Sequence, residues 1–138
     1  MYDSINQDTF TPIIEDDALL MQYITKWLLE LGMKPNLKGF IYLKEAIYLH
    51  SDIIYTNKRF NYIYTLIAYK YCVSAKNVER SIHRSIEAVW NSNTLNRSHK
   101  LFESAYINAD YPPANTVFIA TMSEVIKLTF NKQKYHCL

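Results

Sequence analysis

Glycine, proline and cysteine are all scarce in this sequence. Its 138 residues include two glycines, four prolines and two cysteines. Glycine and proline are the residues that most often interrupt helices and form turns. Hydrophobic residues make up 49% of the chain, which is enough for a core of ordinary size. We therefore predict an all-α fold in one domain, with short connections.

The chain also lacks the motifs that most often carry chemistry. Cys72 and Cys137 show no CxxC spacing, so we expect neither a zinc site nor a disulfide framework. No glycine-rich phosphate loop, HExxH or GxSxG motif is present. Cys72 with His83 is one conceivable nucleophile and base, but we expect Cys72 to lie at a buried turn. The sequence predicts no catalytic residue, no metal and no cofactor.

Long hydrophobic runs are missing as well. No segment approaches the roughly 20 apolar residues that a helix needs to cross a bilayer. The first residues, MYDSINQD, are polar and acidic and do not resemble a signal peptide. We therefore expect a cytoplasmic protein with no membrane partner.

Positive charge is present in only a small excess, but it is concentrated. The net charge is +2, yet Met1 to Asp52 contain four Lys or Arg against eight Asp or Glu. From Lys58 to Lys100 there are eight Lys or Arg against two Glu. Such a local positive field is typical of a surface that binds nucleic acid.

Helical spacing of apolar residues divides the chain. We predict a flexible lead-in at residues 1–14, a domain at 15–130 and a C-terminal tail at 131–138. Inside the domain we expect helices from the acidic residues 15–17 to Gly32, from about Asn36 to Tyr55, from Leu95 to Ala105, and from a capping Asn115 to about Leu128. Tyr111 to Pro113 should form a stiff loop.

The stretch from Phe60 to Trp90, FNYIYTLIAYKYCVSAKNVERSIHRSIEAVW, predicts a helix-turn-helix. Two short helices joined by a tight turn place their apolar residues at a fixed stagger. Ser74 has the side chain to cap the second helix. Cys72 occupies a turn position where glycine is usual, which costs about 1–2 kcal/mol for other residues. The expected core positions are Ala68, Cys72, Val73, Val78 and Ile82.

The second helix of this stretch has a polar face opposite its apolar one. At 100° per residue, Val78, Ile82, Ile86 and Val89 cluster on one side. In a helix-turn-helix, the N-terminal half of the second helix enters the major groove of DNA. The candidate DNA-binding residues on that half are Lys76, Asn77, Glu79, Arg80, His83 and Arg84.

Three segments carry a family resemblance. GFIYLKEAIYL at Gly39 to Leu49, VERSIHRSIEAVW at Val78 to Trp90 and FIATMSEVIKL at Phe118 to Leu128 closely resemble the C-terminal DNA-binding effector domain of the stage 0 sporulation protein A family. These are response regulators that initiate sporulation. The resemblance runs from about Leu19 to Leu128, with the three segments in the right order.

The resemblance implies a six-helix, all-α effector domain that binds short repeated promoter boxes as a head-to-tail pair. It implies base readout by Glu79 and Arg80, with Lys76, Asn77, His83 and Arg84 touching bases or phosphates. It also implies contact with the sigma factor of RNA polymerase through a region that would include Leu101 and Phe102. Arg80 is the best candidate for reading guanine, because bidentate contact with O6 and N7 is the commonest specific contact.

The resemblance also shows departures. The family usually has arginine where Asn77 stands, and an Arg-His order where this chain has His83-Arg84. Members of the family carry an N-terminal receiver domain that is phosphorylated, whereas residues 1–14 are too short to supply one. We expect either an excised effector domain or, because these residues do not resemble an expression tag, a complete short protein.

A second hypothesis follows from the same departures. The chain would then be a protein-interaction module that pairs with a full-length regulator or with RNA polymerase and does not read DNA. Asn77 in place of arginine and the twelve tyrosines favour this alternative, since tyrosine is enriched at interfaces. The leading hypothesis is a sequence-specific, non-enzymatic transcription regulator that binds double-stranded DNA.

Overall fold

The computed structural model describes residues 17–51, 59–92 and 111–136, with side chains described as far as residue 130. These residues form five helices and no strand, which confirms the all-α prediction. The helices are 17–30, α2 (Lys38–Ser51), α3 (Phe60–Tyr71), α4 (Ala75–Asn91) and α7 (Asn115–His136). The predicted lead-in, the predicted helix at Leu95 to Ala105, and Leu101 and Phe102 lie outside the described residues.

The first helix ends where the sequence predicts. Gly32 has a φ of 93°, in the left-handed region that favours glycine. The N–H of Gly32 donates to the Leu29 carbonyl, and the N–H of Met33 donates to the Leu28 carbonyl. This is a Schellman ending, and Met33 after it is buried. The apolar stripe of this helix places Ile24, Trp27 and Leu28 in the core, and Leu31, directly after the helix, is buried as well.

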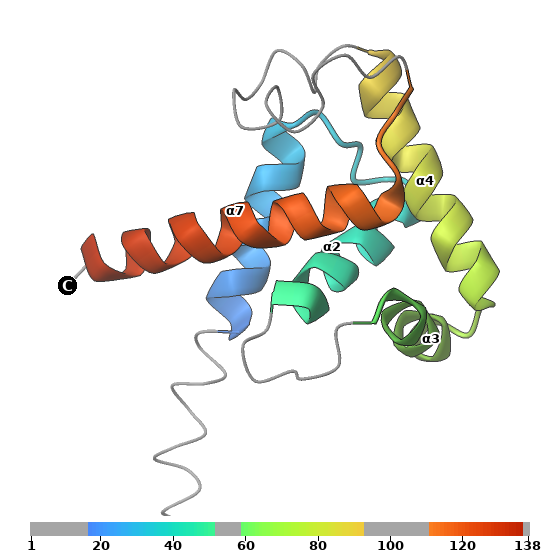
Figure 1. Ribbon diagram of the computed structural model, residues 1–138, viewed down its shortest axis with the longest axis horizontal. Helices are drawn as coiled ribbons and strands as arrows, with labels where there is room; N and C mark the ends of the chain where they lie inside the picture. The colour runs from blue at the N-terminus through green and yellow to red at the C-terminus, as the bar shows by residue number, and fades with distance from the viewer. Residues whose placement is uncertain (1–16, 52–58, 93–110, 137–138) are drawn as a thin grey trace, which may run out of the picture.

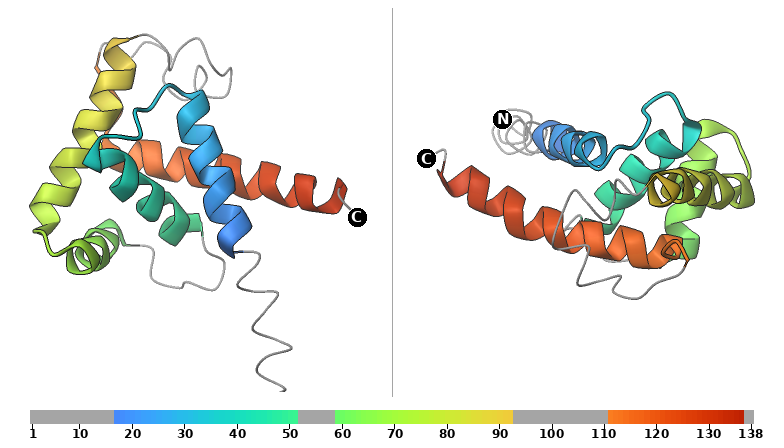
Figure 2. Two further views of the ribbon diagram at one scale, coloured as in Figure 1. Left: turned by 180° about the vertical axis from the view of Figure 1, so that it is seen from behind. Right: turned by 90° about the horizontal axis from the view of Figure 1, so that it is seen from above.

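Helix α2 lies at the centre of the molecule and packs on α3, α4 and α7 (Figure 1). Its buried residues include Phe40, Leu43, Ala46 and Ile47. Seen from above, α4 and the helix at 17–30 lie on opposite sides of α2 (Figure 2). The buried hydrophobic residues of the described helices form one cluster around α2.

Gly39 allows α2 and α4 to approach closely. A Cβ atom added to Gly39 would lie 2.1 Å from the Ser81 carbonyl oxygen and 2.1 Å from the Ser85 Oγ. No real side chain tolerates contacts this short, and the Ser81 atom belongs to the backbone. Gly39 is therefore required by packing.

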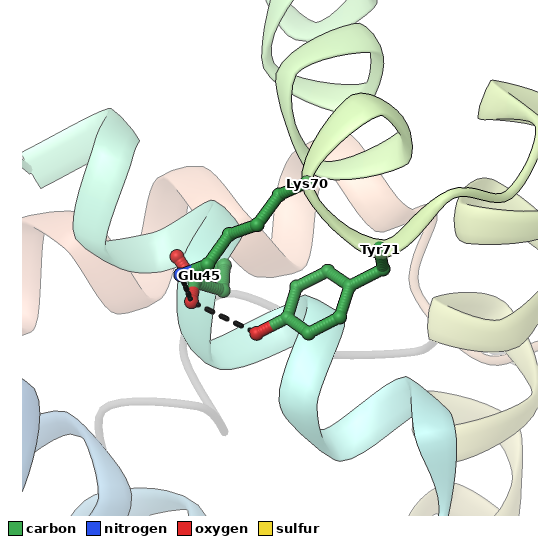
Figure 3. Close-up of polar contacts among 3 residues, drawn as sticks. All are labelled: Glu45, Lys70 and Tyr71. Atoms are coloured by element: carbon green, nitrogen blue, oxygen red, sulfur yellow. Dashed lines mark hydrogen bonds and ion pairs between the residues drawn. The ribbon is translucent and has the colours of Figure 1, made fainter.

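A polar cluster joins α2 to the end of α3 (Figure 3). The Glu45 carboxylate accepts a hydrogen bond of 2.5 Å from Lys70 Nζ and one of 3.1 Å from the Tyr71 hydroxyl. The Tyr71 ring also contacts the ring of Tyr42 on α2, with centroids 5.4 Å apart. These contacts fix the last turn of α3, directly before the turn that leads to α4.

Helix boundaries depart from the prediction at two places. Helix α2 begins at Lys38, and the described part of it reaches Ser51, so its predicted end at Tyr55 lies outside the described residues. Helix α7 continues to His136, so its predicted end at about Leu128 is wrong. No glycine or proline interrupts residues 115–136, so nothing local stops the helix at Leu128.

His50 is satisfied by its neighbours, as its isolation in the sequence suggests. Its Nδ1 lies 2.9 Å from the Ser123 Oγ of α7, and its ring stacks on Phe60 with centroids 5.1 Å apart. The side chain therefore joins three helices.

We predict that Gly39→Ala lowers the free energy of unfolding by about 1–3 kcal/mol, the usual cost of overpacking a core. Alanine is otherwise favoured over glycine inside a helix by about 1 kcal/mol, so a loss would come from the collision with Ser81. Urea denaturation measures the change. The control is Lys38→Ala, an exposed neighbour that should change stability by less than about 0.5 kcal/mol. A stabilised Gly39→Ala variant would contradict the packing argument.

Candidate nucleic-acid interface

Helices α3 and α4 are joined by a turn of three residues, Cys72 to Ser74. Cys72 has a φ of 56°, so it adopts the left-handed conformation expected for a turn position usually held by glycine. The Cys72 N–H donates to the Tyr69 carbonyl, and the Val73 N–H donates to the Ala68 carbonyl at 3.0 Å. This hydrogen-bond pattern is the same Schellman ending that closes the first helix.

The structure corrects one of the predicted core positions. Ala68, Val78 and Ile82 are buried, and Val73 is partly buried against the core. Cys72 is exposed, so the prediction of a buried Cys72 is wrong. The reason lies in the Schellman ending, in which the residue after the left-handed one packs back against the helix. Val73 fills that position, and Cys72 faces solvent.

Ser74 caps α4 as predicted. Its Oγ accepts a hydrogen bond of 3.1 Å from the Asn77 N–H, and its backbone is extended, with φ −81° and ψ 153°. The cap satisfies one of the N–H groups that the first turn of a helix leaves without a partner. The cap also fixes the first turn of α4, which carries Lys76 and Asn77.

The two faces of α4 are sharply separated. The buried face consists of Val78, Ile82, Ser85, Ile86 and Val89. All six candidate DNA-binding residues lie outside it: Lys76, Asn77, Glu79, Arg80 and Arg84 are exposed, and His83 is partly exposed. Their side chains share one surface of the N-terminal half of the helix.

Intrahelical pairing on this surface is weak. His83 Nε2 lies 3.8 Å from the Glu87 carboxylate, one turn further along α4, and both side chains are about half exposed. Among the described residues, no ion pair engages Lys76, Arg80 or Arg84. These cations remain available to an anionic partner.

The beginning of α7 holds α4 in place beside these residues. Asn115 Nδ2 donates a hydrogen bond of 2.8 Å to the Glu79 backbone carbonyl. The predicted role of Asn115 as the cap of α7 is wrong, because it is the first residue of the helix and its Oδ1 accepts no hydrogen bond in the described part of the chain. Its amide is directed towards α4 instead.

An open pocket of about 580 Å³ lies where α3, α4 and α7 meet. Lys76, Glu79, Arg80 and His83 line it from α4. Tyr64 lines it from α3, and Ala114, Asn115 and Thr116 line it from the start of α7. Four of the six candidate residues therefore border one depression.

Tyr64 is a buried tyrosine that lines this pocket. Its side chain is 4% exposed, and its hydroxyl has no hydrogen-bond partner among the described residues. Burial raises the pKa of Tyr64, the nearby Asn115 side chain offsets part of that rise, and the Glu79 carboxylate adds to it. Asn115 exerts this influence without reaching good hydrogen-bond geometry to the hydroxyl. Tyr64 is therefore a neutral O–H group at neutral pH.

Sequence reasoning did not identify Tyr64 or Asn115 as part of this surface. Tyr64 lies among apolar residues of α3, and a tyrosine in such a position predicts only a core residue. Asn115 carries the local pattern of a helix cap. Neither pattern reports which distant helix the side chain meets.

A model of the family described as the C-terminal domain of the sporulation initiation factor Spo0A matches residues 24–126. The chain belongs to this family. Members of the Spo0A C-terminal family are DNA-binding transcription regulators of sporulation rather than enzymes. The match covers all of α2, α3 and α4, and so includes the turn, the pocket and the candidate residues.

Residues 17–51, 59–92 and 111–136 contain no cluster of three or more His, Cys, Asp or Glu side chains that would hold a metal ion. None of the helices in the same ranges has the length and hydropathy of a membrane span.

We predict that Ser74→Ala lowers the free energy of unfolding by about 1 kcal/mol, because the Asn77 N–H loses its acceptor. Ser74→Asp should retain the wild-type stability, since aspartate caps helices as well as serine does. Chemical denaturation of the three proteins compares them directly. Equal stability of the alanine and wild-type proteins would show that the cap contributes nothing.

We predict that alkaline pH destabilises the protein through its shifted tyrosines. Burial raises the pKa of Tyr64 and Tyr71 above the ordinary 10.0. As pH rises past that value, the unfolded chain releases these protons while the folded chain still holds them, so the free energy of unfolding falls. Denaturation at a series of pH values should show a shallower fall for Tyr64→Phe than for wild type. Tyr69→Phe, at a side chain 87% exposed, should follow wild type.

Proposed function

We propose that this protein is a sequence-specific transcription regulator that reads promoter DNA with α4. In this proposal α3, the turn at Cys72 to Ser74 and α4 act as a helix-turn-helix, and the N-terminal half of α4 enters the major groove. The observation that carries the proposal is the cap at Ser74 followed by an exposed surface bearing Lys76, Arg80 and Arg84. Membership of a DNA-binding family supports it.

Glu79 and Arg80 are the proposed base-reading residues. The Arg80 guanidinium can donate two hydrogen bonds to guanine, a contact worth about 1–3 kcal/mol of discrimination. The Glu79 carboxylate can accept from the amino group of cytosine. A carboxylate beside DNA weakens binding to any duplex by charge repulsion. Its presence on this surface therefore favours sequence-specific base contacts over non-specific electrostatic binding.

Lys76, Asn77, His83 and Arg84 are the proposed supporting contacts. A lysine or arginine that meets a phosphate adds affinity without sequence preference. Asn77 contributes no charge, so the positive field of this surface comes from Lys76, Arg80 and Arg84. Binding as a head-to-tail pair on tandem sites, contact with the RNA polymerase sigma factor and a cytoplasmic location complete the proposal.

A protein-interaction module is the second candidate. Exposed large side chains favour it, in particular Tyr69 at 87% and Leu128 at 64% exposure. Such a module would bind a full-length regulator or polymerase through these side chains, and α4 would not contact DNA.

Salt dependence separates the two candidates. We predict that the protein binds a duplex with two tandem family boxes more tightly than a scrambled duplex. The logarithm of the binding constant should fall with the logarithm of salt, with a slope near −0.9 for each phosphate neutralised. Fluorescence anisotropy between about 50 and 200 mM salt measures both properties. Weak and equal binding to the two duplexes would favour the interaction module.

Substitutions on α4 assign the roles within the same assay. Arg80→Lys keeps the charge but loses the bidentate fork, so it should reduce box preference by about tenfold or more while retaining most of the scrambled binding. Lys76→Ala should weaken binding to both duplexes by the same factor. Lys26→Ala removes the same charge from the helix at 17–30, on the far side of α2, and should leave both affinities unchanged (Figure 2). Equal effects of Arg80→Lys and Lys76→Ala on both duplexes would exclude base readout by Arg80.

A further inference from the structure

The pocket between α3, α4 and α7 has features that the α4 readout does not use. Its α7 side is the beginning of a 22-residue helix. The Phe118 N–H makes the first helical hydrogen bond, to the Ala114 carbonyl at 3.0 Å. The N–H groups of the three residues before Phe118 therefore have no acceptor within the helix.

Among the residues that the structure describes, no side chain replaces the missing acceptor. The residue before α7 is Ala114, whose methyl group cannot accept a hydrogen bond. The Asn115 side chain is directed to the Glu79 carbonyl. The helix start thus presents N–H donors, together with the partial positive charge of roughly +0.5 that a helix N-terminus carries.

Tyr64 supplies a second, independent indication. Tyr64 lines the same pocket, and its buried hydroxyl has no hydrogen-bond partner in the described part of the chain. Leaving a buried polar group without a partner is costly, and such groups are usually satisfied by a protein atom, by water or by a ligand. Because burial raises the pKa of Tyr64, the group remains a donor at neutral pH.

The charges around the pocket favour an anion. Lys76 and Arg80 are positive, His83 adds an N–H donor, and Glu79 is the one carboxylate among the described residues of the lining. The N–H groups of α7 add to the positive side of this balance. Backbone N–H groups at a helix start combined with lysine or arginine form a common type of phosphate site.

We infer that this pocket binds a phosphate group, held by the N–H groups at the start of α7, the Tyr64 hydroxyl and Lys76. Asn115 contributes its backbone N–H, since its Oδ1 is an acceptor. The inference rests on the proposed function for the source of the phosphate, which is the DNA backbone beside the groove that α4 enters. The same chemistry would also accept a free phosphate.

Ala114 offers a test in which stability and binding change in opposite directions. In Ala114→Asp, the new carboxylate caps α7 and occupies its N–H groups, so the midpoint of unfolding should rise. The same carboxylate excludes a phosphate. Affinity for boxed and scrambled duplexes should then fall by a common factor of about ten, as for one charge-assisted hydrogen bond, and the salt slope should fall by about 0.9.

Two neutral variants separate the site from general repulsion. Ala114→Asn occupies the same N–H groups without adding charge, and Tyr64→Phe removes only the hydroxyl. Each should lower affinity for both duplexes by about threefold, which is about half of the effect expected for the charged variant on a logarithmic scale. Leu128→Asp adds the same negative charge at an exposed position further along α7 and is the matched control. If both neutral variants bind the two duplexes with wild-type affinity, the phosphate bound in the pocket does not come from the DNA backbone.

Titration with inorganic phosphate tests directly whether the pocket binds phosphate. NMR amide shifts at residues 115–117 should move with phosphate in the wild-type protein and stay fixed in Ala114→Asp. Shifts without any effect of the variants on duplex binding would identify free phosphate as the source. Neither shifts nor duplex effects would overturn the inference. If the wild-type protein binds no duplex, the proposed function fails, while the titration still tests the pocket.

Discussion

The close contact between α2 and α4 is the constraint on which the arrangement of the candidate interface depends. Gly39 brings the backbone of α2 against Ser81 and Ser85, at a distance that no Cβ atom permits. Ser81 lies on α4 among the candidate residues, between Arg80 and His83, and Ser85 directly follows Arg84. Because the contact involves the Ser81 carbonyl, it fixes the backbone of α4 and with it the direction in which the outward side chains point.

Two further elements remove the remaining freedom of α4. The Schellman ending at Cys72 and the cap at Ser74 fix its first turn relative to α3. Glu45 in turn fixes the last turn of α3 on α2 through Lys70 and Tyr71 (Figure 3). The proposed binding of this surface in a DNA groove would benefit from such rigidity, since ordering a mobile helix on binding would cost free energy.

Local patterns predicted most of the fold, and contacts between distant helices explain what they missed. The 3.6-residue spacing is a local property, so the buried face of α4 and the cap at Ser74 could be read from the sequence. The left-handed Cys72 could be read too, but its exposure depends on the hydrogen bonds of Val73 and Cys72 to α3. Asn115 carried a capping pattern, yet its partner lies 36 residues away on α4. For the same reason, the sequence did not predict the pocket, although all four residues on its α4 side were candidate residues.

The hydrogen bond from Asn115 to α4 ends on a main-chain carbonyl, and main-chain atoms are the same for every amino acid. Residue 79 therefore plays two separable parts, one through its backbone and one through its side chain. In the proposed readout, a substitution there would change what the surface recognises and leave the anchor on α7 in place. Recognition in this fold can thus diverge during evolution, one side chain at a time, without rebuilding the support that positions it.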